Sequence, residues 1–98
     1  MIIKIPLRFE GSKGEKHLYA LFDSGATYSC ITEEVAGLLT IPEQLFTPMR
    51  LATAKDDVHI IINATARLDF FHDDIRLSDE FLIVPGLSED VIIGAHTM

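Results

Sequence analysis

The stretch that decides the fold is residues 21–27, Leu-Phe-Asp-Ser-Gly-Ala-Thr. It places the carboxylate of Asp23 directly after apolar residues, on a turn built from small side chains. Burying a carboxylate without partners is costly, so this position needs compensating hydrogen bonds. Ser24, Gly25 and Ala26 leave room for backbone N–H groups to approach, and glycine also permits a positive φ. The stretch therefore predicts a carboxylate held where backbone segments crowd together.

Strands and turns are predicted on both sides of this stretch. Residues 3–9 alternate apolar and polar side chains, which is typical of a strand with one buried face, and Pro6 predicts an exposed edge there. A polar turn over 10–16 leads into a strand over 17–22, so the chain opens with a hairpin. Further strands are predicted over 28–31, 49–54, 58–71, 76–84 and 91–93, with polar turns at 55–57 and 72–74.

A short helix is expected over residues 33–39. Thr32 is its predicted N-cap, and Glu33 and Glu34 suit the positive end of the helix dipole. Many short strands with one helix indicate an all-β barrel or sandwich. The length of 98 residues suits a single domain, 1–98.

Composition and charge exclude several classes of protein. The formal net charge of -7 disfavours binding to nucleic acid and to anionic membranes. The single cysteine, Cys30, cannot form an internal disulfide, which fits a reducing compartment. The N-terminus lacks the pattern of a signal peptide, and no apolar run approaches the roughly 20 residues of a spanning helix. We therefore expect a soluble, cytoplasmic protein.

A second motif stands near the far end of the chain, where an apolar strand ends in glycine: Ile92-Ile93-Gly94. Together with residues 23–27, this motif makes the sequence resemble the retropepsin-like aspartic proteases over nearly its whole length. The resemblance implies a closed β-barrel with one short helix and a flap hairpin. It also implies a homodimer that hydrolyses a peptide or protein substrate with one Asp23 from each chain and a water molecule, without a metal or organic cofactor.

The resemblance also implies roles for the neighbouring residues. Ser24 would brace the two catalytic turns across the dimer, while Gly25 and Thr27 would meet the main chain of the substrate. Ala26 would line the pocket wall, and Ile92, Ile93 and Gly94 would form the crossover loop beside the catalytic turn. The flap tip would be Ala54, Lys55, Asp56 and Asp57, four residues that include no glycine and also suit a solvated turn.

Other interpretations remain open or are weaker. A retropepsin-like domain could serve only for dimerisation or for holding a peptide, and the sequence barely separates that role from catalysis. The run His72-Asp73-Asp74 could attract a hard cation, although a solvated turn is favoured there. Cys30 is expected in the core, and a nucleophilic Ser24 lacks the flanking glycines of a Gly-x-Ser-x-Gly elbow. A small ligand-carrying barrel would leave the charged turn unexplained.

Overall fold

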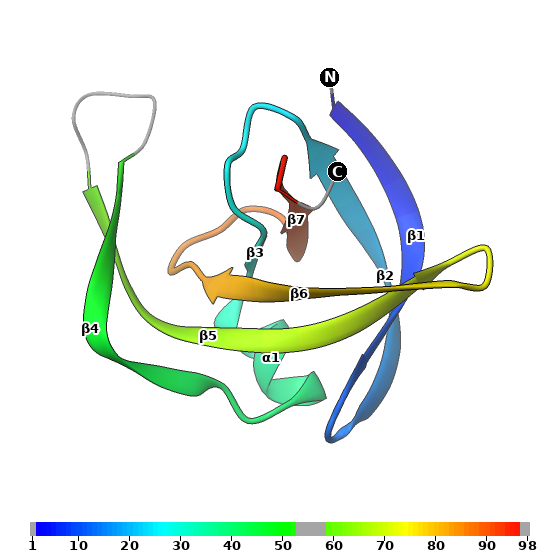
Figure 1. The fold of residues 1–98 in the computed structure, drawn as a ribbon, viewed down its shortest axis with the longest axis horizontal. Helices are drawn as coiled ribbons and strands as arrows, with labels where there is room; N and C mark the ends of the chain where they lie inside the picture. Colours follow the sequence, from blue (N-terminus) through cyan, green and yellow to red (C-terminus); the bar gives the residue numbers. More distant parts are fainter. Residues whose placement is uncertain (1, 53–58, 97–98) are drawn as a thin grey trace.

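The computed structural model describes residues 2–52 and 59–96, whose strands curl around an apolar interior made of two clusters of buried side chains (Figure 1). The elements are β1 (Ile2–Gly11), β2 (Gly14–Asp23), β3 (Cys30–Ile31), α1 (Glu33–Leu39), β4 (Glu43–Ala52), β5 (His59–His72), β6 (Ile75–Ile83) and β7 (Val91–Ile93). The sequence predictions match these elements to within a few residues. This holds for the helix predicted over 33–39 and for the strands predicted over 17–22, 28–31, 76–84 and 91–93.

The described strands close into a six-stranded mixed barrel in the order β1, β2, β7, β3, β6, β5, with β5 returning to β1. β4 extends the sheet beyond β5, so β4 and β5 form the two arms of a hairpin that reaches out from the barrel (Figure 1). The predicted all-β barrel with one short helix is confirmed. The predicted tip of that hairpin, residues 54–57, lies outside the described residues.

The barrel closes along a short seam where β1 meets β5. Arg8, Phe9 and Glu10 pair there with Phe71, Phe70 and Asp69. On the inner side, the rings of Phe9 and Phe70 lie 5.5 Å apart, and Phe81 of β6 contacts both rings. All three phenylalanines are fully buried, so the seam is fixed mainly by apolar packing.

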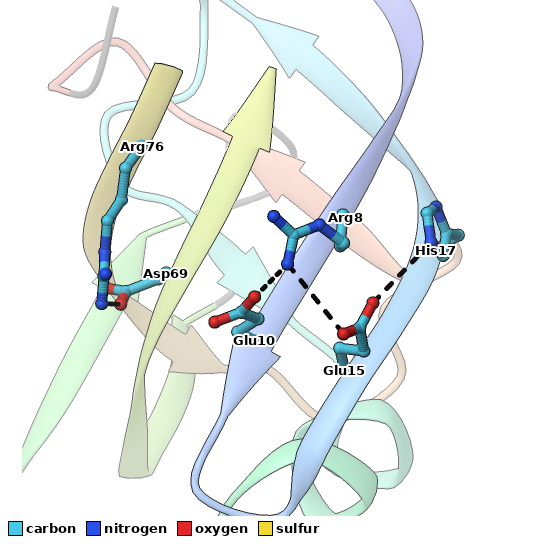
Figure 2. A network of polar contacts seen from close by, with 6 residues as sticks. All are labelled: Arg8, Glu10, Glu15, His17, Asp69 and Arg76. Atoms are coloured by element: carbon cyan, nitrogen blue, oxygen red, sulfur yellow. Dashed lines mark hydrogen bonds and ion pairs between the residues drawn. The ribbon is translucent and has the colours of Figure 1, made fainter. Parts of the chain in front are cut away.

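The outer side of the same seam carries charged side chains (Figure 2). Arg8 donates a hydrogen bond to Glu10 and lies 4.0 Å from Glu15 on β2. The Arg8 guanidinium also lies 4.0 Å from the ring centre of Phe71. Arg8 and Glu10 are half-buried at this surface, where solvent still screens the pair, so it adds little to the stability that the apolar side provides.

Helix α1 is capped at both ends by groups from its surroundings. The Thr32 hydroxyl accepts a hydrogen bond from the N–H of Val35 at 3.2 Å, as predicted for an N-cap. At the other end, the carbonyl of Leu39 accepts from the N–H of Lys13 in the first hairpin, at 2.9 Å. Gly11 is required at this contact, because a Cβ there would lie 2.3 Å from the Leu39 oxygen. The helix is therefore anchored to the opening hairpin.

Strand β4 begins at Glu43, earlier than the predicted start at residue 49. Its pairing with β5 shifts register between Gln44 and Met49, and Pro48 lies inside that irregular segment. The interruption hides the period-two pattern, because Pro48 breaks the pairing and the apolar Phe46 is fully exposed between the partly buried Leu45 and Met49. Pro6 agrees with its prediction, since β5 pairs with β1 only from Arg8 onward.

Candidate active site

Asp23 is the last residue of β2, and its side chain is half-buried at the start of the small-residue turn. The N–H of Gly25 donates to the Asp23 carboxylate Oδ1 at 2.9 Å, and the N–H of Ala26 donates to the Asp23 carbonyl at 3.0 Å. Gly25 is close to this oxygen, since a Cβ there would lie 3.2 Å from Oδ1. The turn therefore fixes the carboxylate orientation with its own backbone.

Strand β7 passes beside the turn and supports it from the far end of the sequence. It runs parallel to β2, with Ile93 beside Phe22, and antiparallel to β3, with Ile92 beside Cys30. Figure 1 shows β7 between these two strands. Directly after β7, the N–H of Ala95 donates to the Ala26 carbonyl at 2.7 Å. The two motifs that are farthest apart in sequence are therefore brought together.

Gly94 allows this close passage. A Cβ on Gly94 would lie 2.6 Å from both the carbonyl carbon and oxygen of Tyr28, closer than real Cβ atoms approach backbone. The N–H of Gly94 donates to the Ser29 hydroxyl at 3.0 Å, in a buried contact. Ser29 itself is only 3% exposed. The buried Ser29 hydroxyl and Gly94, which has no side chain, therefore join β7 to the segment after the Asp23 turn.

The turn opens onto a cavity of about 430 Å³. Gly25, Ala26 and Thr27 form one side, and Leu51 and Ala52 of β4 form the other. The cavity therefore lies between the turn that carries Asp23 and an arm of the β4–β5 hairpin. Of the other predicted site residues, Ser24 is exposed on the turn. The predicted flap tip, Ala54, Lys55, Asp56 and Asp57, lies outside the described residues.

The other candidate groups of the sequence do not form a site. Asp73 and Asp74 make a tight hairpin turn with φ of 49° and 66°, and His72 lies 3.7 Å from the Asp73 carboxylate. Within residues 2–52 and 59–96, no group of three or more His, Cys, Asp or Glu side chains is placed to hold a metal. Burial raises the pKa of the Cys30 thiol to about 11, which disfavours the nucleophilic thiolate.

Residues near the site that were not singled out from the sequence include Leu51 and Ala52 of the cavity wall and Tyr28, Ser29 and His96. The rings of Tyr28 and His96 lie 5.7 Å apart, with planes inclined by 33°. Ser29 could have been noticed as a hydroxyl next to the apolar pair Cys30 and Ile31. The contact with His96 had no sequence signal, because it depends on how closely β7 approaches β3.

Comparison with known proteins agrees with this architecture. A family profile described as retroviral aspartyl protease matches residues 15–97. Among solved structures, the protease of simian foamy virus (mac) is similar to this chain with a TM-score of 0.54 and 22% identity, over 95% of this chain and 90% of that one. No curated protein matches the sequence.

The profile spans most of the chain, including both the Asp23 turn and Ile92-Ile93-Gly94. The chain belongs to the retroviral aspartyl protease family. The likeness to the foamy virus protease independently supports the fold. No helix in the described part of the chain is long and apolar enough to cross a membrane.

Proposed function

We propose that this protein is an aspartic endopeptidase that works as a homodimer, with one Asp23 from each chain. The observation that carries the proposal is the position of the Asp23 carboxylate. The Gly25 N–H orients this carboxylate, the Ala95 N–H after β7 joins the same turn at Ala26, and Gly25, Ala26 and Thr27 of the turn line a cavity bounded by an arm of the β4–β5 hairpin. Family membership makes peptide-bond hydrolysis the reaction to test.

Two copies are needed because one chain carries one such turn. The run Asp-Ser-Gly-Ala-Thr occurs once in the sequence. If a two-fold axis passed beside the turns, the two Asp23 carboxylates would approach each other, as symmetric pairing requires for residues near the axis. Ser24, exposed on the same turn, would then lie at the contact between the two copies.

Two close carboxylates cannot both ionise cheaply, so in the proposed dimer they would share one proton. The ionised carboxylate removes a proton from a water molecule while that water attacks the scissile carbonyl carbon. The protonated carboxylate donates its proton to the carbonyl oxygen, which gives a neutral tetrahedral diol. Its collapse breaks the C–N bond, and a proton passes to the leaving amine. No covalent link to the enzyme forms.

Cleavage is expected to be favoured in mildly acidic solution, because the Asp23 pair must retain one proton. A rate that continued to rise through alkaline pH would contradict this mechanism. The cavity beside the turn, which β4 borders on its other side, suits a peptide whose backbone pairs with β4 and with the turn.

The direct test is digestion of a peptide library by the wild-type protein and by Asp23→Asn, with products identified by mass spectrometry. The proposal predicts specific cleavage by wild type and loss of cleavage in the variant. If the wild-type dimer cuts no library peptide but binds some of them, the protein is a peptide-binding module instead. Sedimentation velocity on both proteins separates a failure to cleave from a failure to dimerise.

A further inference from the structure

A second cavity lies at the base of the β4–β5 hairpin, away from the Asp23 turn. The pairing of β5 with β6 begins at Thr65 and Leu82, so the part of β5 before Thr65 pairs with β4 alone among the described strands (Figure 1). The cavity there, which we call the base cavity, has a volume of about 240 Å³. It shares no lining residue with the cavity beside the Asp23 turn, so it is a separate candidate site.

The walls of the base cavity are mostly apolar and come from four parts of the chain. Pro42 precedes β4, Ile61 lies on β5, Ile83 ends β6, and Pro85 lies in the loop that follows. Ile83 is buried in the main core, whereas Ile61 and Pro85 are exposed, so the cavity is backed by the core and opens to solvent. Its volume is below the roughly 300–1,000 Å³ of most small-molecule sites and suits a single long side chain.

Three polar residues line the same cavity: Glu33 of α1, Gln44 of β4 and Asn63 of β5. All three are exposed. In the described part of the chain, Glu33 forms no ion pair, and no Lys or Arg lines the cavity. Two further carboxylates, Glu34 and Glu43, are direct sequence neighbours of lining residues. The surroundings of the base cavity therefore favour a positively charged group.

An arginine side chain matches both the walls and the polar groups. Its methylene stem packs on apolar surface, while its guanidinium presents five N–H donors in a flat fork. The Glu33 carboxylate accepts two of these in parallel, and the amide oxygens of Gln44 and Asn63 are acceptors for others. Lysine offers a compact charge with three donors and matches such a set of acceptors less well.

We propose that the base cavity binds an arginine side chain of a partner polypeptide, with Glu33 as its counter-ion. The site goes beyond the proposed function, because none of its lining residues belongs to the Asp23 turn. A partner held there would be attached to the protein outside the cavity where cleavage is proposed.

The test is an NMR titration of isotopically labelled wild-type protein with the peptide acetyl-Leu-Arg-Leu-amide. Its control is the same peptide with citrulline, which keeps the shape of arginine without the charge. The side-chain amide groups of Gln44 and Asn63 report on the cavity directly, and we expect saturable shifts there and at the backbone N–H groups of Glu33 and Ile61. The citrulline peptide should bind at least about tenfold more weakly, because the charge-assisted hydrogen bonds are lost.

Matched variants separate the site from general electrostatics. Glu33→Gln should weaken binding of the arginine peptide about tenfold. Glu34→Gln removes the same charge at the next residue, which is exposed and does not line the cavity, and should stay within about twofold of wild type. Ile61→Ser should weaken binding several-fold by removing apolar wall. Ile75→Ser, at a side chain that is 60% exposed and lies outside the cavity, should leave binding unchanged.

Equal affinity for the two peptides, or equal losses from Glu33→Gln and Glu34→Gln, would overturn the inference. Shifts confined to Gly25, Ala26 and Thr27 would overturn it too, because the peptide would then occupy the cavity beside Asp23. If the spectra show that Glu33→Gln does not fold, the arginine and citrulline peptides decide the question on wild type. Failure of the proposed function is separately visible, since Asp23→Asn cleaves nothing and should still bind the arginine peptide as wild type does.

Discussion

Two acidic turns in this barrel, Asp23-Ser24-Gly25 and His72-Asp73-Asp74, look alike in sequence but differ in surroundings. The first follows β2, and β7 crosses beside it. The second joins β5 to β6 as a tight hairpin, where the Asp73 side chain is 87% exposed. At the first turn the backbone orients the carboxylate, whereas at the second the carboxylates face solvent. An acidic turn becomes a candidate site when distant strands enclose it.

The difference between the two turns is tested most strongly by replacing an aspartate with asparagine in each of them. Asp23→Asn should lower kcat/KM by at least about 10²–10⁴-fold, because it removes the group proposed to exchange a proton with water and substrate. Asp73→Asn should stay within about twofold of wild type, since Asn tolerates a positive φ and the residue lies on the surface. Initial rates on one cleaved peptide measure both, and similar losses from the two variants would remove the distinction.

The crossover beside the first turn should be sensitive to a single methyl group. Gly94→Ala forces a Cβ against the backbone of Tyr28, and we expect it to lower the free energy of unfolding by about 1–3 kcal/mol or more. Gly37→Ala is the matched control, because its Cβ would meet nothing within 4 Å and alanine favours a helix. Urea unfolding should show that control to be stabilised by roughly 0.5–1 kcal/mol. Equal stability of Gly94→Ala and wild type would contradict the tight crossover.

The buried hydroxyl of Ser29, just after the first turn, should contribute nearly as much to the free energy of unfolding as the close packing at Gly94. Ser29→Ala leaves the N–H of Gly94 without that acceptor, at a cost of about 1–3 kcal/mol. Ser88→Ala, at an exposed position, should change stability by less than about 0.5 kcal/mol. Thermal and urea unfolding of the two variants give the comparison. A Ser29→Ala variant as stable as Ser88→Ala would show that the bond contributes nothing.

The smallest effect on stability is expected beside the second turn, at Asp69, whose carboxylate lies on β5 shortly before that turn. A hydrogen bond from Arg76 lowers the pKa of Asp69 (Figure 2), so the ionised form is favoured in the folded state. This stabilisation is present above the unfolded pKa of about 3.9 and is lost as pH falls through the folded value. For an exposed pair we expect less than about 1 kcal/mol.

The measurement for this pair compares urea midpoints of wild type and Asp69→Asn at pH 6 and at pH 3. Wild type should be the more stable protein at pH 6, and the difference should shrink at pH 3. A difference that grew on acidification would reverse the sign of the expected linkage.

Much of the fold was predictable because its signals are local. The N-cap at Thr32, the helix at 33–39 and the apolar strand at 91–93 each depend on neighbouring residues. The early part of β4 was not predicted, because the exposed Phe46 and Pro48 hide its strand pattern and its pairing with β5 is irregular there. Closure of β1 against β5 also left no local pattern, since Phe9 and Phe70 meet only after the barrel has formed.

The candidate site divides in the same way. The turn at Asp23 and the motif ending at Gly94 were recognisable from residue type, because both need small side chains at crowded backbone. The bond of the Ser29 hydroxyl and the tilted ring contact of Tyr28 with His96 depend on the distance between β3 and β7, which no short stretch encodes. The catalytic role of Asp23 stays a prediction, because it depends on a second copy of the chain.

That dependence can be measured directly by mixing. Wild type and Asp23→Asn are unfolded together, refolded at different ratios with the total protein concentration fixed, and assayed for cleavage of one peptide. If each active site needs an intact Asp23 from both copies, activity should follow the square of the wild-type fraction, with about one quarter remaining in an equal mixture. Activity that falls linearly, with about half remaining, would show that each chain works alone and would contradict a shared pair of Asp23 carboxylates.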